Sequence, residues 1–254
     1  MLVAAAVCPC PPLLVPAVAA AAAPELDAVR AACSDALAVL AAARPDLLIV
    51  VGPAERDGRG PHPQGAVGSF RGFGVDVEVV LGGTGPAGTG SGLVGAGAAA
   101  GVEERAERVL PLSLAVAAWL LDRVRWSAAP VSGLGVGEPL AAERCIQAGK
   151  EIVARSDRVA LLVMGDASAC RSVKAPGYLD ERAAGFDEEV ARALAAADVT
   201  ALKALDAELA SALKAAGRAP WQLLAGAAEG AGLHGELLYD AAPYGVGYLV
   251  ATWS

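Results

Sequence analysis

Aromatic side chains are scarce in this chain: they make up 4% of its 254 residues, although hydrophobic residues make up 55%. This scarcity excludes a core assembled mainly from large rings. The apolar content is mostly alanine, valine and leucine, which suits alanine-rich helices packed on strands of valine and leucine. A chain of this length buries a substantial core, and we expect one domain that spans residues 1–254.

The chain also lacks a repeated Cys-x2-Cys pair, and its cysteines are odd in number. The missing pairs exclude the usual zinc-ribbon arrangement, and the odd count argues against a disulfide framework. Reduced thiols in a cytoplasmic protein are the simplest interpretation. The five cysteines are Cys8, Cys10, Cys33, Cys145 and Cys170.

No stripe of basic residues is present, and the net charge is −8. This pattern argues against nucleic acid as a partner, because its phosphates require clustered lysine and arginine. The uncharged stretch 2–24 lacks a basic segment before it and is interrupted by Pro9, Pro11, Pro12 and Pro16. We predict neither a signal peptide nor a membrane span there.

Apolar runs of strand length alternate with segments of helical periodicity. Strands are predicted at 2–7, 47–51, 75–81, 159–164, 236–239 and 247–252, and helices at 24–43, 113–124, 141–156, 187–197 and 201–216. This alternation predicts an α/β sandwich, with a central mixed β-sheet flanked by helices. Ligand sites in such folds lie beyond the strand ends. The loops at Cys10, Gly52-Pro53 and Gly165-Asp166 should therefore converge.

Three further local predictions concern segments between these elements. Residues 55–68 are polar and rich in glycine and proline, which predicts a loop. Residues 82–101 are close to low complexity in glycine, alanine, serine and threonine, which predicts a flexible loop. Ser113 is predicted to cap the helix that follows it.

The segment Cys8-Pro9-Cys10-Pro11-Pro12-Leu13-Leu14 follows the first predicted strand directly. With the segments 47–53, 161–168 and 243–248, taken in that order along the chain, it resembles the class III extradiol ring-cleavage dioxygenase superfamily. The resemblance extends over nearly the whole chain. It implies an α/β sandwich and, for active members, an Fe(II) cofactor held by two histidines and one glutamate, with another histidine as acid/base.

Carried over residue by residue, the resemblance places none of these groups in this chain. The first ligand histidine falls on Cys10, the second at or near Ala54, the acid/base histidine on Ala169, and the glutamate around Ala219-Pro220. Four absent groups leave no facial set of iron ligands. We therefore expect no cofactor and no family-type catalytic residue, so that the chain is a diverged member that has lost iron-dependent ring cleavage.

The loops at the predicted strand ends remain candidates for a small-molecule pocket, with a small aromatic or anionic ligand as its occupant. Asp166 and Ser168 are interpreted either as caps of the next segment or as ligand-binding residues, and Lys174 and Tyr178 either as solvated surface or as recognition groups. The candidate pocket residues are Cys10, Pro11, Gly52, Pro53, Ala54, Gly165, Asp166, Ser168, Lys174 and Tyr178.

Two other functions stay open at this stage. In the first, an active metal-dependent oxygenase or hydrolase uses unorthodox ligands drawn from Cys10, His62, Glu55 and Asp57; the competing interpretation of His62 is a solvated loop residue. In the second, the chain is a scaffold or interaction subunit, with a homo-oligomer as one form. Metal content tests the first alternative and oligomeric state the second.

Overall fold

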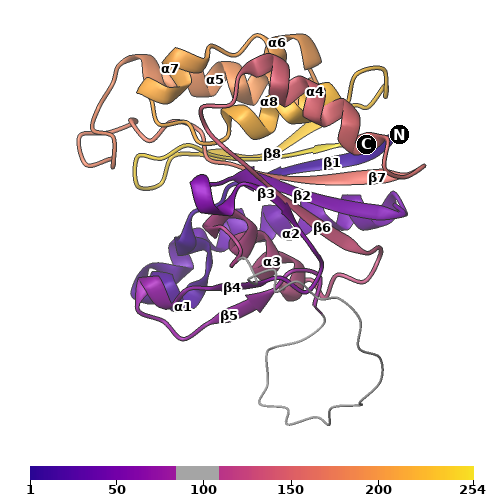
Figure 1. Ribbon diagram of the computed structural model, residues 1–254. Coiled ribbons are helices and arrows are strands. Elements are labelled where there is room, and N and C mark those ends of the chain that lie inside the picture. The colour runs from indigo at the N-terminus through magenta and orange to yellow at the C-terminus, as the bar shows by residue number, and fades with distance from the viewer. Residues whose placement is uncertain (84–108) are drawn as a thin grey trace.

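The computed structural model describes residues 1–83 and 109–254, and its centre is a seven-stranded mixed sheet (Figure 1). The strand order is β3-β6-β2-β7-β1-β9-β8, and β4 and β5 form a separate two-stranded sheet. The strands are β1 (Leu2–Cys8), β2 (Leu47–Pro53), β3 (Gly60–His62), β4 (Val67–Ser69), β5 (Glu78–Val80), β6 (Val131–Val136), β7 (Val159–Met164), β8 (Gly235–Ala241) and β9 (Tyr248–Trp253).

Four neighbouring strands run parallel, and their carboxyl ends meet at one edge of the sheet. β7 pairs in parallel with both β1 and β2, with Cys8 opposite Met164 and Val51 opposite Val163. β6 extends the parallel set beyond β2, whereas β3, β9 and β8 are antiparallel to their neighbours. The predicted convergence of the loops after β1, β2 and β7 follows from this register. We call this side of the sheet the carboxyl edge.

Helices cover both faces of the sheet (Figure 1). One layer holds α4 to α8 and the other holds α2 and α3, so the predicted α/β sandwich with a mixed sheet is confirmed. The α-helices are α1 (Pro16–Ala19), α2 (Asp27–Ala42), α3 (Leu112–Arg123), α4 (Ala142–Val153), α5 (Arg182–Ala195), α6 (Val199–Lys203), α7 (Ala207–Ala212) and α8 (Arg218–Ala227), and the 3₁₀ helices are η1 (Pro12–Leu14), η2 (Ala20–Leu26), η3 (Arg56–Gly58) and η4 (Arg71–Phe73).

The core consists of two apolar clusters, one on each face of the sheet. Alanine, valine and leucine dominate both, as the composition predicts, and all five cysteines are buried and free. Helices α4 and α8 pack unusually closely. A Cβ atom added to Gly149 of α4 would overlap the carbonyl oxygen of Leu223, and one added to Gly226 of α8 would overlap that of Ile146. Only glycine permits the two backbones to approach so closely.

The sequence interpretation missed three strands. β3 lies inside the segment 55–68 that was predicted as a loop, β4 begins within that segment, and β6 is a strand where none was predicted. β6 contains Gly133 and Gly135, which weaken the sequence pattern of a strand. In the structure these glycines admit close neighbours: a Cβ atom at Gly135 would overlap the carbonyl oxygen of Gly58.

One helix prediction and one cap prediction were also wrong, and one helix was missed. The single helix predicted at 201–216 is divided into α6 and α7, because Asp198 and Asp206 each accept backbone N–H bonds at a helix start. α8 was not predicted. Ser113 does not cap α3, since its hydroxyl donates to the carbonyl oxygen of Pro53 at 2.7 Å.

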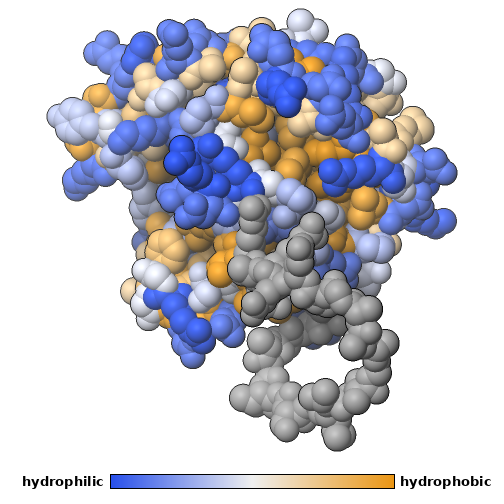
Figure 2. All heavy atoms as spheres, in the orientation of Figure 1, coloured by the Kyte–Doolittle hydropathy of each residue, from blue (hydrophilic) through white to orange (hydrophobic). Residues whose placement is uncertain are grey.

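Polar side chains dominate the outer surface of the helices, and hydrophobic ones gather toward the middle of the face shown in Figure 2. In the ranges 1–83 and 109–254, no helix has both the length and the apolar character that a membrane crossing requires. The loop predicted at 82–101 falls, apart from Gly82 and Gly83, outside the described residues.

Candidate functional site

The carboxyl edge brings together Cys10, from the loop after β1, and Asp166, from the loop after β7. The backbone N–H of Cys10 donates to Asp166 Oδ1 at 2.8 Å, and the Cys10 thiol makes a longer contact of 4.0 Å with Oδ2. Cys10 is 7% exposed, so the thiol predicted at a pocket mouth is buried. Burial, followed by the nearby Asp166 charge, raises the pKa of Cys10 well above its usual range, so the thiol stays protonated.

Asp166 occupies a fixed position beside β1, β9 and α8. Gly165 N–H donates to Cys8 O, Ala167 N–H to Gly247 O, and Gly217 N–H to Asp166 O, each within 3.0 Å. Burial raises the pKa of Asp166 to about 7, and the hydrogen bond from Cys10 N–H opposes this shift in part. The residue as a whole is partly exposed, and the raised pKa means that its carboxyl group changes charge near neutral pH.

The raised pKa predicts that Asp166 makes the protein less stable as the pH rises. The pKa of an aspartate in an unfolded chain is about 3.9. Between pH values of about 3.9 and about 7, the native state therefore keeps a proton on Asp166 that the unfolded state loses. The contribution to stability is complete below the unfolded pKa and is lost as the pH rises to 7. Because the side chain is partly exposed, we expect Asp166→Asn to be more stable than wild type at pH 8 by about 1–2 kcal/mol.

Urea unfolding at pH 5 and pH 8 checks this prediction. The two proteins should differ little at pH 5, where native Asp166 is neutral like asparagine. A variant that is less stable than wild type at pH 8 would contradict the assigned cause. Cys10→Ser keeps the backbone donor to Asp166 and serves as the control, for which we expect the pH dependence of wild type.

The end of β2 lies beside β7 at the same edge. A Cβ atom added to Gly52 would lie 2.5 Å from the hydroxyl oxygen of Ser113 and 3.2 Å from the Cβ of Met164. Pro53 and Ala54 follow and are partly exposed, and Ala54 N–H donates to Val136 O at 2.8 Å. The sequence did not predict Ser113 at this place, because an N-cap explained the residue equally well.

Ser168 belongs to a buried hydrogen-bond cluster that supports the loop after β7. Asp187 of α5 accepts from Ser168 N–H at 2.8 Å, from the Ser168 hydroxyl at 2.9 Å and from Arg171 Nη1 at 2.9 Å. Burial raises the pKa of Asp187 despite these donors. The interpretation of Asp166 and Ser168 as helix caps was wrong: Asp166 binds Cys10, and Ser168 binds Asp187.

The remaining predicted pocket residues lie apart from this contact or carry no reactive group. Pro11 and Gly165 are buried, whereas Lys174 and Tyr178 are exposed on the loop before α5. The positions that correspond to the other family groups are Ala54, Ala169 and Ala219-Pro220. Their side chains offer no metal ligand and no titratable group.

His62 is buried, which corrects its interpretation as a solvated loop residue. It lies on β3, is 1% exposed, and contacts Gly58 O through Nε2 at 2.8 Å, while Nδ1 has no hydrogen-bond partner within the described residues. Three strands separate β3 from β1, so four strand spacings of about 4.8 Å put His62 roughly 19 Å from the Cys10 strand. The alternative in which Cys10 and His62 share a metal ion is therefore contradicted by the strand order.

The other members of the unorthodox ligand set are also dispersed. Glu55 and Asp57 are exposed at η3. Within residues 1–83 and 109–254, no three histidine, cysteine, aspartate or glutamate side chains are grouped so that they could hold a metal ion.

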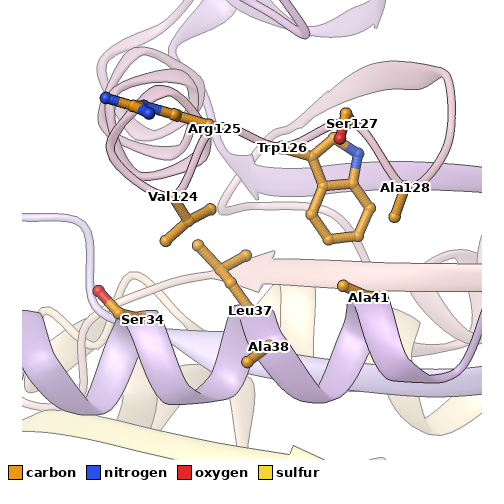
Figure 3. Close-up of a pocket in the computed structure, with 9 residues that line it drawn as sticks. All are labelled: Ser34, Leu37, Ala38, Ala41, Val124, Arg125, Trp126, Ser127 and Ala128. Carbon is orange, nitrogen blue, oxygen red and sulfur yellow. The ribbon is translucent and has the colours of Figure 1, made fainter.

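The larger of two described cavities, about 440 Å³, lies away from the carboxyl edge (Figure 3). Leu37 and Ala41 of α2 face the ring of Trp126 across it, whereas the Arg125 side chain points away. Its walls come from α2 and from the segment between α3 and the start of β6, at the amino end of that strand. The sequence interpretation did not predict this cavity, because its apolar lining residues, such as Leu37 and Ala41, also fit a core.

Comparisons with known proteins support the architecture alone. No protein-family model matches the chain, and no curated protein matches it significantly in sequence. Among solved structures, the chain is similar to the crystal structure of uncharacterized protein JW3007 from Escherichia coli K12, with a TM-score of 0.51 and 13% sequence identity. The alignment covers 99% of this chain and 100% of that one. The likeness therefore extends over the complete sandwich.

Proposed function

We propose that this chain is a diverged member of the class III extradiol ring-cleavage dioxygenase superfamily that does not cleave aromatic rings with iron and retains a small-molecule site. The observation that carries the proposal is the chemistry of the carboxyl edge. The positions where the resemblance expects histidine and glutamate hold Cys10, Ala54, Ala169 and Ala219-Pro220. The titratable contact at this edge is between Cys10 and Asp166.

This donor set does not fit Fe(II). Iron of this type requires two imidazoles and a carboxylate on one face, with open positions for substrate and oxygen. Asp166 is one carboxylate, the Cys10 thiol is held protonated, and the described histidines lie elsewhere or are exposed. Asp166 has instead the properties of a group that accepts a proton or a hydrogen bond from a ligand.

Iron analysis and oxygen consumption test the proposal. Purified protein incubated with Fe(II) under argon and then desalted should retain far less than one iron per chain. Its oxygen uptake with a panel of catechols should equal that of a protein-free blank. Cys10→Ser, analysed in parallel, accounts for iron held by the thiol alone. One iron per wild-type chain together with ring-opened product would overturn the proposal.

The homo-oligomer remains a prediction, with one observation in its favour. Val173, Tyr178 and Leu179 expose 58%, 65% and 48% of their surface on the loop before α5. Exposed apolar side chains grouped on one loop are frequent at protein–protein contacts. Light scattering after size-exclusion chromatography should give a mass above the 25.3 kDa of one chain. A single-chain mass at the highest concentration tested would exclude the oligomer.

A further inference from the structure

The Asp166 carboxylate lacks a positive partner at the carboxyl edge. None of the ion pairs within the described residues includes it, and Oδ2 receives only the 4.0 Å thiol contact. A carboxylate accepts about four hydrogen bonds, and one strong bond, from Cys10 N–H to Oδ1, is made. The group therefore has unused acceptor capacity, above all on Oδ2.

The cations nearest in sequence and fold are engaged elsewhere. Arg171 pairs with Asp187 at 2.9 Å, and Lys214 Nζ lies 3.4 Å from Pro176 O. Arg218, at the start of α8, donates to the carbonyl oxygens of Glu138 and Leu140. Within the described part of the chain, no lysine or arginine is therefore ion-paired with Asp166. A partly buried carboxylate without a cation destabilises the folded protein.

Tyr248 supplies a second, independent observation at the same place. The residue is 2% exposed, and its hydroxyl takes part in none of the hydrogen bonds of the described residues, although the oxygen atom itself is not fully enclosed. Gly247, the residue directly before Tyr248, exchanges backbone hydrogen bonds of 2.8 Å with Ala167 and Ser168, so the start of β9 lies beside the loop that carries Asp166. Burial raises the pKa of Tyr248, and the charge of Asp166 adds to that shift. The hydroxyl of a buried tyrosine normally has a partner. A hydroxyl without a hydrogen-bond partner, next to a carboxylate without a cation, indicates a binding position.

The arrangement is rigid before any ligand arrives. The three backbone hydrogen bonds around Asp166 join its loop to β1, β9 and α8, and Gly165 packs against Gly217 so closely that a Cβ atom has no space. A carboxylate that is already fixed loses little conformational entropy on binding. In the loop that leads into β9, the Tyr244 hydroxyl donates to Glu25 Oε2 at 2.8 Å.

We propose that the carboxyl edge binds a small organic cation, of the primary amine class, through an ion pair with Asp166 and a hydrogen bond with the Tyr248 hydroxyl. The ammonium group provides the charge and the donors that Asp166 lacks, and an attached ring or alkyl group would contact the tyrosines. An anionic ligand, one of the classes expected from the sequence, would instead face the repulsion of the carboxylate. The inference deepens the proposed function and rests on it for the location of the site.

Calorimetric titration with benzylamine, benzyl alcohol and benzoate tests the inference. These probes share a ring and carry a positive, a neutral and a negative group. At pH 8 we expect benzylamine to bind at least about tenfold more tightly than either of the others, which equals about 1.4 kcal/mol. The affinity for benzylamine should fall at pH 5.5, because Asp166 is then protonated. The neighbouring titratable groups Cys10 and Tyr248 have raised pKa values and are neutral at both pH values, so they do not contribute to this change.

Two variants distinguish loss of the proposed ion pair from loss of the folded structure. Asp166→Asn should remove the preference for benzylamine while remaining folded, and Tyr248→Phe should weaken binding several-fold. Asp76→Asn, which changes a carboxylate that is 82% exposed and ion-paired with Arg71, should bind as wild type does. Any of three results would overturn the inference. They are equal affinity of wild type for the three probes, an Asp166→Asn variant that binds benzylamine as wild type does, and no benzylamine binding up to about 10 mM, a concentration at which even weak specific binding is measurable. The iron and oxygen experiment has its own outcome, so either proposal can fail alone.

Discussion

Replacing Gly149 by alanine is expected to lower the free energy of unfolding by about 3–4 kcal/mol, because the added Cβ meets backbone rather than a movable side chain. The carbonyl oxygen of Leu223 and the backbone nitrogen of Ala227, both on α8, occupy its position. Relief would require α4 and α8 to separate along their full contact. Gly226→Ala, which meets the Ile146 carbonyl from the opposite side, should have an effect of similar size.

Gly185→Ala is the matched control for this prediction. Gly185 lies within α5, and a Cβ atom added there has nothing within 4 Å. Alanine is the better helix former, so this variant should gain about 0.5–1 kcal/mol. Urea unfolding followed by circular dichroism measures all three variants. Equal effects at Gly149 and Gly185 would show that helix propensity, not the close crossing of α4 and α8, determines the result.

The second large effect is expected at Asp187, where alanine should cost about 3 kcal/mol. The substitution leaves both the backbone N–H and the hydroxyl of buried Ser168 without their acceptor, and each unsatisfied donor costs about 1–3 kcal/mol. Arg171, which is 29% exposed, recovers part of its hydration. Because this cluster supports the loop that carries Asp166, the variant should also lose benzylamine binding.

Asp76→Ala provides the comparison for Asp187. Asp76 contacts Arg71 at 2.8 Å, close to the 2.9 Å of Arg171 and Asp187, but its side chain is 82% exposed. Solvent screens this surface pair, so its loss should change unfolding little. Asp187→Asn retains one acceptor oxygen and should fall between the two. A cost at Asp76 as large as that at Asp187 would contradict the role assigned to burial.

Much of the fold followed from the sequence because the apolar runs were strong and bounded. The run Val159–Met164 was predicted to the residue, and Leu2–Cys8 and Leu47–Pro53 nearly so. β6 was not predicted because Gly133 and Gly135 weaken the strand pattern in the sequence. Their role, which is to permit close packing against neighbouring residues, is visible only in the structure. α8 escaped because Pro220 lies in its first turn, where proline is tolerated but resembles a break.

The site was predictable in place but not in its contacts. Strand order brought Cys10 and Asp166 to one edge, as expected from the parallel register. The residues adjacent in sequence do not determine the hydrogen-bond partner of each side chain. A serine at position 168 is compatible with a helix cap and also with a hydrogen bond to Asp187, which is 19 residues away. His62 was misassigned because its neighbours Gly60, Pro61 and Pro63 are typical of turns, whereas pairing with β6 buries it.

The position of β1 in the sheet has a consequence for biosynthesis. This strand lies between β7 and β9, so its partners begin at Val159 and at Ala251 and are synthesised long after it. Until those segments emerge from the ribosome, a nearly uncharged strand has both hydrogen-bonding edges open, a state that favours association with other chains. We therefore expect slow translation before residue 159 to increase aggregation of the nascent chain.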